Sequence, residues 1–126
     1  MQEDSAILVI EDDEASAYYL EEILSELEIP VITATTASEA IEIVNKNKIK
    51  LIFMDIRLPD MDGYELTTIL RNKGITIPII AQTAFVLPDD RDKAISSGCD
   101  EYLPKPLRKE ILWETIHKFL STPIPL

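Results

Sequence analysis

Short apolar runs alternate with amphipathic segments along the whole chain, and this alternation constrains the fold more than any other feature of the sequence. A strand buried on both faces of a parallel sheet is continuously apolar, whereas an amphipathic helix repeats its apolar residues at three- and four-residue steps. Runs of the first kind occupy residues 6–10, 31–34, 51–54, 78–81 and 101–103. A segment with helical spacing follows each run, so we expect five strand–helix units.

The expected helix boundaries carry their own signals. The acidic stretch Glu11–Glu14 precedes the first helix, where negative charge suits the helix dipole, and Pro30 is expected to end that helix. Ser38 is predicted to cap the second helix. Gly74 and Gly98 are expected to end the third and fourth helices.

Strands that alternate with helices over the whole length predict an α/β fold, a doubly wound (βα)5 three-layer sandwich with a parallel five-stranded sheet. The alternation by itself leaves the strand order open. Right-handed connections and a flavodoxin-like order, 2-1-3-4-5, would place the carboxyl ends of the first and third strands side by side. Folds of this class bind ligands at such a point, so we expect the functional site there.

The composition fits one globular domain, since 46% of the 126 residues are hydrophobic and 28% are charged. We expect the domain to span 6–120, between an N-terminal linker at 1–5 and a proline-punctuated linker at 121–126. The acidic N-terminus is unlike a signal peptide, and no apolar run has the roughly 18 residues of a membrane span, so we expect a cytoplasmic chain without membrane contact. Cys99 is the single cysteine, which excludes an internal disulfide, and it is expected to be a buried, inert thiol.

The charge balance narrows the range of partners. Twelve Lys and Arg stand against 23 Asp and Glu, and a formal charge of -11 repels phosphate backbones, so we expect no direct nucleic-acid binding. An acidic surface can gather divalent cations, but it can also serve only to keep the chain in solution.

Carboxylates follow two of the predicted strands directly. Glu11 and Asp12 come after the first strand and Asp55 after the third, so the expected topology brings all three to one edge of the sheet. Oxygen ligands at a half-open site suit Mg2+, which would relieve the repulsion between the like charges. Taken singly, the first two could only open a helix, and Asp55 could be a turn residue.

Two further polar residues follow the fourth and fifth strands. Thr83 and Lys105 would face the same edge, where a hydroxyl and an ammonium group could stabilise the charge on a transferring phosphoryl group. Taken singly, Thr83 could cap the next loop and Lys105 could be an ordinary surface lysine.

Four stretches stand at characteristic positions: Ile7–Asp13, Met54–Gly63, Ala81–Ala84 and Tyr102–Pro106. Together they resemble one family, the receiver domain of response regulators in bacterial two-component signalling, over nearly the whole chain from Ile7 to Leu120. Their order and spacing are similar to those of the family's motifs. The resemblance implies phosphorelay signalling, in which the chain takes a phosphoryl group from a histidine kinase or a histidine phosphotransfer protein.

The resemblance also implies roles for individual residues. Asp55 would be phosphorylated, Asp12 would bind Mg2+ directly, Glu11 would bind it through water, and the Arg57 carbonyl would be a backbone ligand. Mn2+ could substitute for Mg2+. Lys105 would pair with the phosphoryl oxygens.

A conformational switch is implied as well. Thr83 and the Ala84 amide would bond the attached phosphoryl group, and Tyr102 would turn inward with it. This change would alter the surface formed by the fourth helix, the fifth strand and the fifth helix, which partners would bind. The Lys105–Pro106 peptide bond resembles the family's cis bond. We expect a monomer or a weak dimer.

By the same resemblance, the chain is a phosphoacceptor with self-catalysed transfer and not an enzyme that turns over substrate. Two positions tune phosphoryl loss in the family, occupied here by the bulky residues Arg57 and Phe85. We hypothesise that Phe85 hinders the attacking water, so that autodephosphorylation is slow; it could instead be a partner-facing or partly buried aromatic.

Three other functions compete with this interpretation. A haloacid-dehalogenase-type phosphatase needs a second Asp where Arg57 stands. A flavin- or nucleotide-binding module would present Gly, Ser or Thr amides where Glu11–Glu14 would repel phosphate. A pseudo-receiver, a protein-binding module without phosphorylation, commonly lacks a site residue, and none is missing here. The stretch Gly98–Pro106 resembles receivers of hybrid histidine kinases, which favours an excised hybrid-kinase domain over a free-standing one.

Overall fold

Five strands alternate with five helices in the computed structural model, which describes residues 5–84 and 87–121. The strands are β1 (Ala6–Ile10), β2 (Val31–Ala34), β3 (Ile49–Asp55), β4 (Ile79–Thr83) and β5 (Glu101–Pro104). The helices are α1 (Glu14–Ser25), α2 (Ala37–Lys46), α3 (Gly63–Asn72), α4 (Asp90–Ser97) and α5 (Lys109–Leu120). None of these described helices is both long and apolar enough to cross a bilayer. Phe85 and nearly all of both expected linkers lie outside the described residues.

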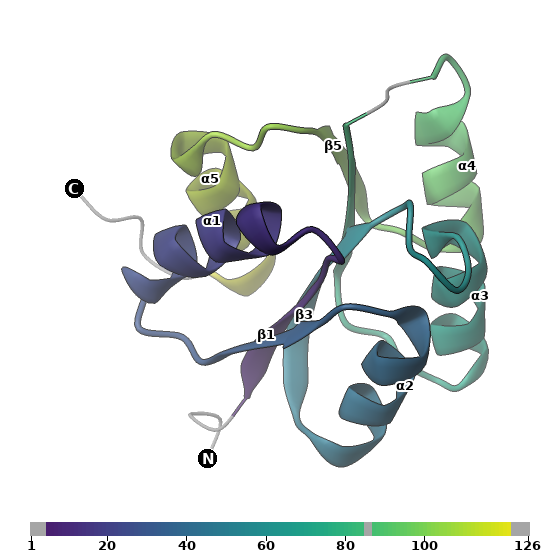
Figure 1. Ribbon diagram of the computed structural model, residues 1–126, viewed down its shortest axis with the longest axis horizontal. Coiled ribbons are helices and arrows are strands. Elements are labelled where there is room, and N and C mark those ends of the chain that lie inside the picture. The colour runs from purple at the N-terminus through teal and green to yellow at the C-terminus, as the bar shows by residue number, and fades with distance from the viewer. Residues whose placement is uncertain (1–4, 85–86, 122–126) are drawn as a thin grey trace.

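The strands form one parallel sheet in the order β2-β1-β3-β4-β5, which confirms the predicted flavodoxin-like topology. Helices α1 and α5 cover one face of the sheet, and α2, α3 and α4 cover the other (Figure 1). The molecule is therefore the expected three-layer sandwich. All five strands run the same way, so their carboxyl ends meet at one edge.

Both faces of the sheet are packed, which explains the continuous apolar runs. In β1, Ile7 and Val9 belong to the hydrophobic cluster of α1 and α5, whereas Leu8 and Ile10 belong to the cluster of α2, α3 and α4. All four side chains are 0% exposed. Burial of one such side chain is worth about 2 kcal/mol, so a polar residue at any of these positions would be costly.

The start of α2 differs from the sequence prediction, because Ser38 does not cap it. Thr36 is the N-cap, and its hydroxyl accepts a hydrogen bond from the Glu39 amide at 3.0 Å. Ser38 is already the second residue of the helix. The Asp60 carboxylate, on the β3–α3 loop, accepts hydrogen bonds from the amides of Ala37 and Ser38 at 2.9 and 3.0 Å. A tertiary contact thus completes this cap.

The end of α1 also differs from the prediction. The helix ends at Ser25, well before Pro30. The apolar Leu27 continues the helical spacing, but its amide bonds the Leu24 carbonyl at 3.0 Å in a turn, and Glu28 has φ 58°. The helical spacing of apolar residues continues past the last regular turn, so the helix predicted from that spacing was too long.

The fourth strand is shifted relative to its predicted range. Pro78 stands before β4, and its carbonyl accepts a hydrogen bond from the Ile52 amide at 3.0 Å. The strand continues to Thr83, two residues beyond the predicted end. Gly98 is confirmed as the residue that ends α4, with φ 114°, a conformation that favours glycine.

Candidate functional site

Two neighbouring strands deliver the acidic residues to one point. β1 and β3 pair in parallel with Ile10 opposite Met54, so the next residues, Glu11 just after β1 and Asp55 at the end of β3, lie at the same level. The carboxylates of Glu11, Asp12 and Asp55 each place one oxygen within 4.8 Å of the others. Glu11 is 1% exposed and Asp55 is 7% exposed, whereas Asp12 is open to solvent.

The other two strands bring the remaining polar residues to the same edge. β3 and β4 pair with Asp55 opposite Gln82, and β4 and β5 pair with Thr83 opposite Pro104. Lys105 follows directly, and its amide donates a hydrogen bond to the Thr83 carbonyl at 2.8 Å. The strand register thus fixes the position of Lys105 along the strand direction relative to Asp55.

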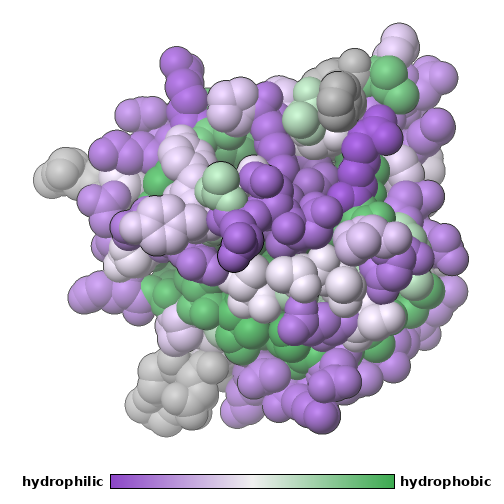
Figure 2. Space-filling view, in the orientation of Figure 1, coloured by the Kyte–Doolittle hydropathy of each residue, from purple (hydrophilic) through white to green (hydrophobic). Residues whose placement is uncertain are grey.

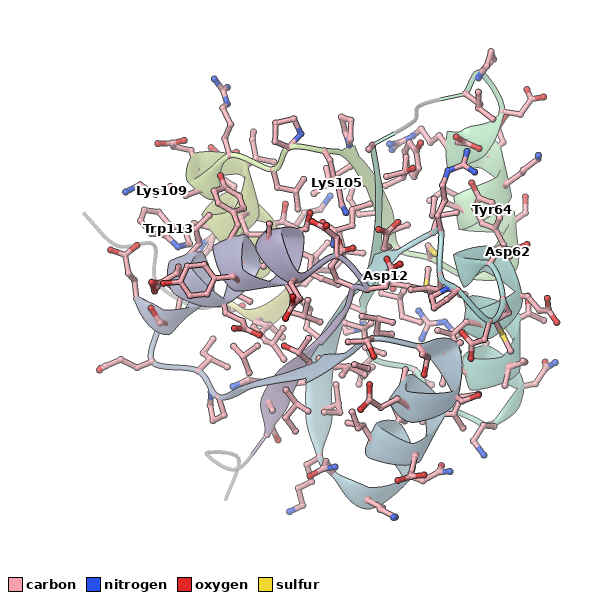
Figure 3. The ribbon with its side chains drawn as sticks, viewed as in Figure 1. Asp12, Asp62, Tyr64, Lys105, Lys109 and Trp113 are labelled. Atoms are coloured by element: carbon pink, nitrogen blue, oxygen red, sulfur yellow. The ribbon has the colours of Figure 1, made fainter. Side chains whose placement is uncertain are left out.

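The Lys105 ammonium group joins two of the carboxylates. Its Nζ donates to Oε1 of Glu11 and, at 3.0 Å, to Oδ2 of Asp55. The side chain of Lys105 is 16% exposed, so it reaches inward from the β5–α5 loop. Asp12 and Lys105 approach the middle of the same face from different loops (Figure 3).

Backbone amides orient the second carboxylate oxygen of Glu11 and of Asp55. The Asp13 amide donates to Oε2 of Glu11 at 3.2 Å, and the Arg57 amide donates to Oδ1 of Asp55 at 3.0 Å. Asp13 itself is the N-cap of α1 and accepts a hydrogen bond from the Ser16 amide, as its predicted place at the helix start requires. Both carboxylates are therefore held by one charged and one neutral donor.

The charges are not balanced. When all three carboxylates are ionised, they face one ammonium group, which leaves two negative charges uncompensated among Glu11, Asp12, Asp55 and Lys105. Burial raises the pKa of Glu11 to about 7, although its hydrogen bond to Lys105 acts to lower it. Burial acts to lower the pKa of Lys105, but its hydrogen bonds to Glu11 and Asp55 prevail and raise it above the ordinary value.

The residues present fit a divalent cation. They offer only oxygen ligands, they carry excess negative charge, and Asp12 leaves the cluster open on one side. Hard cations such as Mg2+ prefer such oxygen ligands and keep part of their water shell at half-open sites. A dication at this point would restore the charge balance, which the single lysine cannot do.

A close approach of α3 forms the floor of this region. The Gly63 amide donates to the Ile56 carbonyl at 2.6 Å. A Cβ at position 63 would lie 2.8 Å from Cε of Met54 and 2.9 Å from Cα of Ile56. Only glycine lets the start of α3 pack this tightly against the residues that flank Asp55.

A cavity of about 490 Å3 adjoins the cluster between α1 and the β5–α5 loop. It is lined by Glu11, Ala15, Ser16, Tyr19, Leu20, Gln82, Ala84, Lys105, Pro106 and Leu107. Hydrophilic surface covers the centre of this face of the molecule in Figure 2. A partner that approaches from this side would therefore meet the charged cluster and an apolar hollow together.

The sequence also predicted features outside this carboxylate cluster. Thr83 is 1% exposed at the end of β4, whereas Ala84 and Arg57 are exposed beside the site. The Lys105–Pro106 bond is cis, and Cys99 is buried, both as predicted. Tyr102 is 6% exposed, so its side chain lies inward.

Sequence reasoning missed the partner of Tyr102. Its hydroxyl donates to Oδ2 of Asp90 at 3.3 Å, and Asp90 is 7% exposed. An acidic residue in the first turn of a helix is already explained by the helix dipole, so Asp90 does not stand out in the sequence. No local pattern marks this contact.

The comparison with known sequences agrees with this geometry. A family model described as the response regulator receiver domain matches residues 7–117. The chain is 32% identical over 114 residues to the sensor histidine kinase RcsC of Salmonella typhimurium, which covers 90% of this chain and 12% of RcsC. This chain therefore spans only a small part of that relative.

Solved structures share the fold over 93% of the chain. A two-component response regulator from Clostridium difficile has 36% identity and a TM-score of 0.88, with 96% of that chain covered. The receiver domain of the sensor histidine kinase PA1611 from Pseudomonas aeruginosa has 30% identity and a TM-score of 0.84, with 98% covered, and holds a magnesium ion in its active site cleft. This chain belongs to the response regulator receiver domain family, whose members are signalling modules of two-component systems.

Proposed function

We propose that this chain accepts a phosphoryl group on Asp55 from the histidine of a histidine kinase or a histidine phosphotransfer protein. The observation that carries the proposal is the position of the Lys105 ammonium group, which bonds Asp55 and Glu11 at the centre of a carboxylate cluster. A lysine in this position can pair with the carboxylate before transfer and with the phosphoryl group after it. The family membership supports the same function.

The transfer step follows from the hydrogen bonds. A carboxylate oxygen of Asp55 attacks phosphorus, and the N–P bond to the donor imidazole breaks with its electron pair left on nitrogen. The Arg57 amide holds Oδ1 of Asp55 in place during this step. Lys105 moves from Oδ2 to a phosphoryl oxygen, which keeps the new charge paired.

A divalent cation belongs to this proposal. Asp12, Asp55 and the Arg57 carbonyl would hold Mg2+ directly, and Glu11 would hold it through water. When bound, Mg2+ would neutralise charge on the phosphoryl oxygens and reduce repulsion among the carboxylates. The structure of PA1611 with magnesium in its cleft supports this part of the proposal.

The attached phosphoryl group would then change the surface of the domain. The Thr83 hydroxyl and the Ala84 amide would bond it, and the surface of α4, β5 and α5 would respond. Tyr102, in β5, would report that response. The similarity to RcsC favours a domain that works within a hybrid histidine kinase.

The test is incubation with Mg2+ and acetyl phosphate, followed by intact mass. The expected result is one added phosphoryl mass that depends on Mg2+. Beryllofluoride should produce Mg2+-dependent NMR shifts at residues around Asp55.

The control is Asp55→Asn, which keeps the side-chain volume and removes the nucleophile. It should gain no mass and should retain the NMR spectrum of a folded domain. If the unaltered chain gains no mass and its spectrum does not respond, the domain is instead a pseudo-receiver that acts only by binding proteins.

A further inference from the structure

The Asp90 carboxylate is a meeting point of three segments of the chain. The Tyr64 hydroxyl of α3 donates to Oδ1 at 3.0 Å, and the Tyr102 hydroxyl of β5 donates to Oδ2 at 3.3 Å. The Leu87 amide, just before α4, donates to Oδ2 at 2.8 Å. One carboxylate therefore fixes a helix, a strand and a loop relative to one another.

The charge on this carboxylate is stabilised where it lies. Asp90 is 7% exposed, so water reaches little of it. The hydrogen bond from the Leu87 amide, with those from Tyr64 and Tyr102, holds the pKa of Asp90 below its ordinary value. Both tyrosine hydroxyls therefore donate to an ionised acceptor, which is stronger than a neutral one.

Tyr64 connects this point to the candidate phosphoacceptor. It follows Gly63, whose absent side chain lets α3 pack against Ile56 and Met54. A Cβ on Gly63 would also lie 3.1 Å from the Asp55 carbonyl oxygen. The backbone at Gly63, the residue before Tyr64, thus lies against the segment that carries Asp55, while the Tyr64 ring lies on the α4 side of α3 (Figure 3).

We propose that Asp90 is a positioning residue that holds Tyr102 inward and couples its position, through Tyr64, to the segment around Asp55. The proposal rests on the proposed function, in which Tyr102 is the switch residue. The chain supplies the inward partner itself, so the inward position of Tyr102 does not require a phosphoryl group. Asp90 shifts a two-state equilibrium of the α4–β5 surface toward the inward form.

A merely structural role for Asp90 predicts something different. An acidic residue in the first turn of α4 favours the helix dipole, and its loss would weaken α4 without a specific effect on Tyr102. Asp92 lies in the same first turn and is exposed. Asp92→Asn therefore makes the same charge change without the two tyrosine contacts.

The experiment uses the metal-free protein labelled with 3-fluorotyrosine and observed by 19F NMR. The chain has four tyrosines, and Tyr102→Phe assigns the resonance of Tyr102. A soluble paramagnetic agent measures how far each ring is exposed to solvent. Asp90→Asn should increase paramagnetic relaxation at Tyr102 at least threefold, whereas Asp92→Asn should change it by less than a fifth.

Tyr64→Phe removes one hydroxyl and keeps the acids of α4. It should increase relaxation at Tyr102 about twofold, because Asp90 loses the donor that fixes Oδ1. This variant decides the question if Asp90→Asn fails to fold. Relaxation at Tyr102 that is unchanged in Tyr64→Phe, or that changes equally in Asp90→Asn and Asp92→Asn, overturns the proposal.

A second readout separates this proposal from the proposed function. Beryllofluoride with Mg2+ should bind Asp90→Asn at least threefold more weakly, because binding would then have to draw Tyr102 inward. If the unaltered chain takes up a phosphoryl group but Asp90→Asn leaves the Tyr102 signal unchanged, only the role of Asp90 is refuted. If Asp90→Asn changes the Tyr102 signal but the unaltered chain takes up no phosphoryl group, only the proposed function is refuted.

Discussion

A cluster built around a basic side chain lies at each end of the sheet, but the two clusters differ in how that side chain is paired. At the amino ends of β4 and β5, Arg71 pairs with the Asp100 carboxylate at 2.9 Å. Its guanidinium also donates at 2.7 to 3.0 Å to the carbonyls of Gly98, Ile75 and Ile77. At the carboxyl ends, Lys105 is shared by the carboxylates of Glu11 and Asp55.

The difference lies in charge balance. In the Arg71 cluster, which is Arg71, Asp100 and the three carbonyls, one cation meets one anion, and Asp100 also accepts from the Ile79 amide at 2.9 Å. In the Lys105 cluster, which is Lys105, Glu11, Asp12 and Asp55, three anions meet one cation. A balanced cluster stabilises the scaffold, whereas an unbalanced one is prepared for added positive charge and for chemistry.

The largest expected effect is on phosphoryl transfer. Lys105→Met keeps the length of the side chain and removes its charge, so transfer from acetyl phosphate to Asp55 should slow by about 100-fold, as for loss of one transition-state donor. Intact mass against time measures the rate. Arg71→Met should keep the rate of the folded protein within threefold, and equal losses in both variants would contradict the distinction between the two clusters.

The second effect is on stability. Arg71→Met should lower the free energy of unfolding by about 3 kcal/mol, the low end for a broken internal pair, because the pair is partly exposed and three carbonyls lose a donor. Urea denaturation measures it. The control is Lys46→Met at the exposed pair Lys46–Glu42, where the side chains are 71% and 68% exposed and the change should be below about 0.5 kcal/mol. A loss of that small size in Arg71→Met would rule out a scaffold role.

The third effect is the response to metal. If Mg2+ binds the folded cluster as proposed, Mg2+ at roughly tenfold its dissociation constant should stabilise the chain by about 1.4 kcal/mol. Asp12→Asn should remove most of this gain and should slightly stabilise the metal-free protein by relieving repulsion. Thermal unfolding with and without Mg2+ measures both changes. Asp100→Asn should keep the full Mg2+ response, and its loss there would mean that the metal binds elsewhere.

The smallest effect concerns Cys99, which lies between Gly98 and Asp100 and is 5% exposed. Burial raises the pKa of its thiol, so less thiolate is present at pH 8.5 than in the unfolded chain. Alkylation by iodoacetamide, followed by mass, should be slower than in urea and should speed up as the pH rises. Arg71→Met should accelerate it and Lys105→Met should not; the reverse order would show that the Arg71 cluster does not protect this region.

Much of the candidate site could be predicted because strand ends are local features. Glu11, Asp55, Thr83 and Lys105 each stand at or just after the end of an apolar run, and a parallel sheet brings all such ends to one edge. The prediction at Ser38 was wrong because three hydroxyl-bearing residues, Thr35, Thr36 and Ser38, stand near the same helix start. Only the fold showed that Asp60 already bonds the amide of Ser38.

The sequence by itself determined the period of each element, the parallel direction of the strands and the residues at the strand ends, since these depend on burial and on backbone geometry along the chain. Only the tertiary structure decided the side-chain partners. Asp90 meets Tyr102 across 12 positions and Tyr64 across 26, and Arg71 meets Asp100 across 29. Such contacts depend on how helices pack against the sheet and on which rotamers that packing allows, and no local period encodes either.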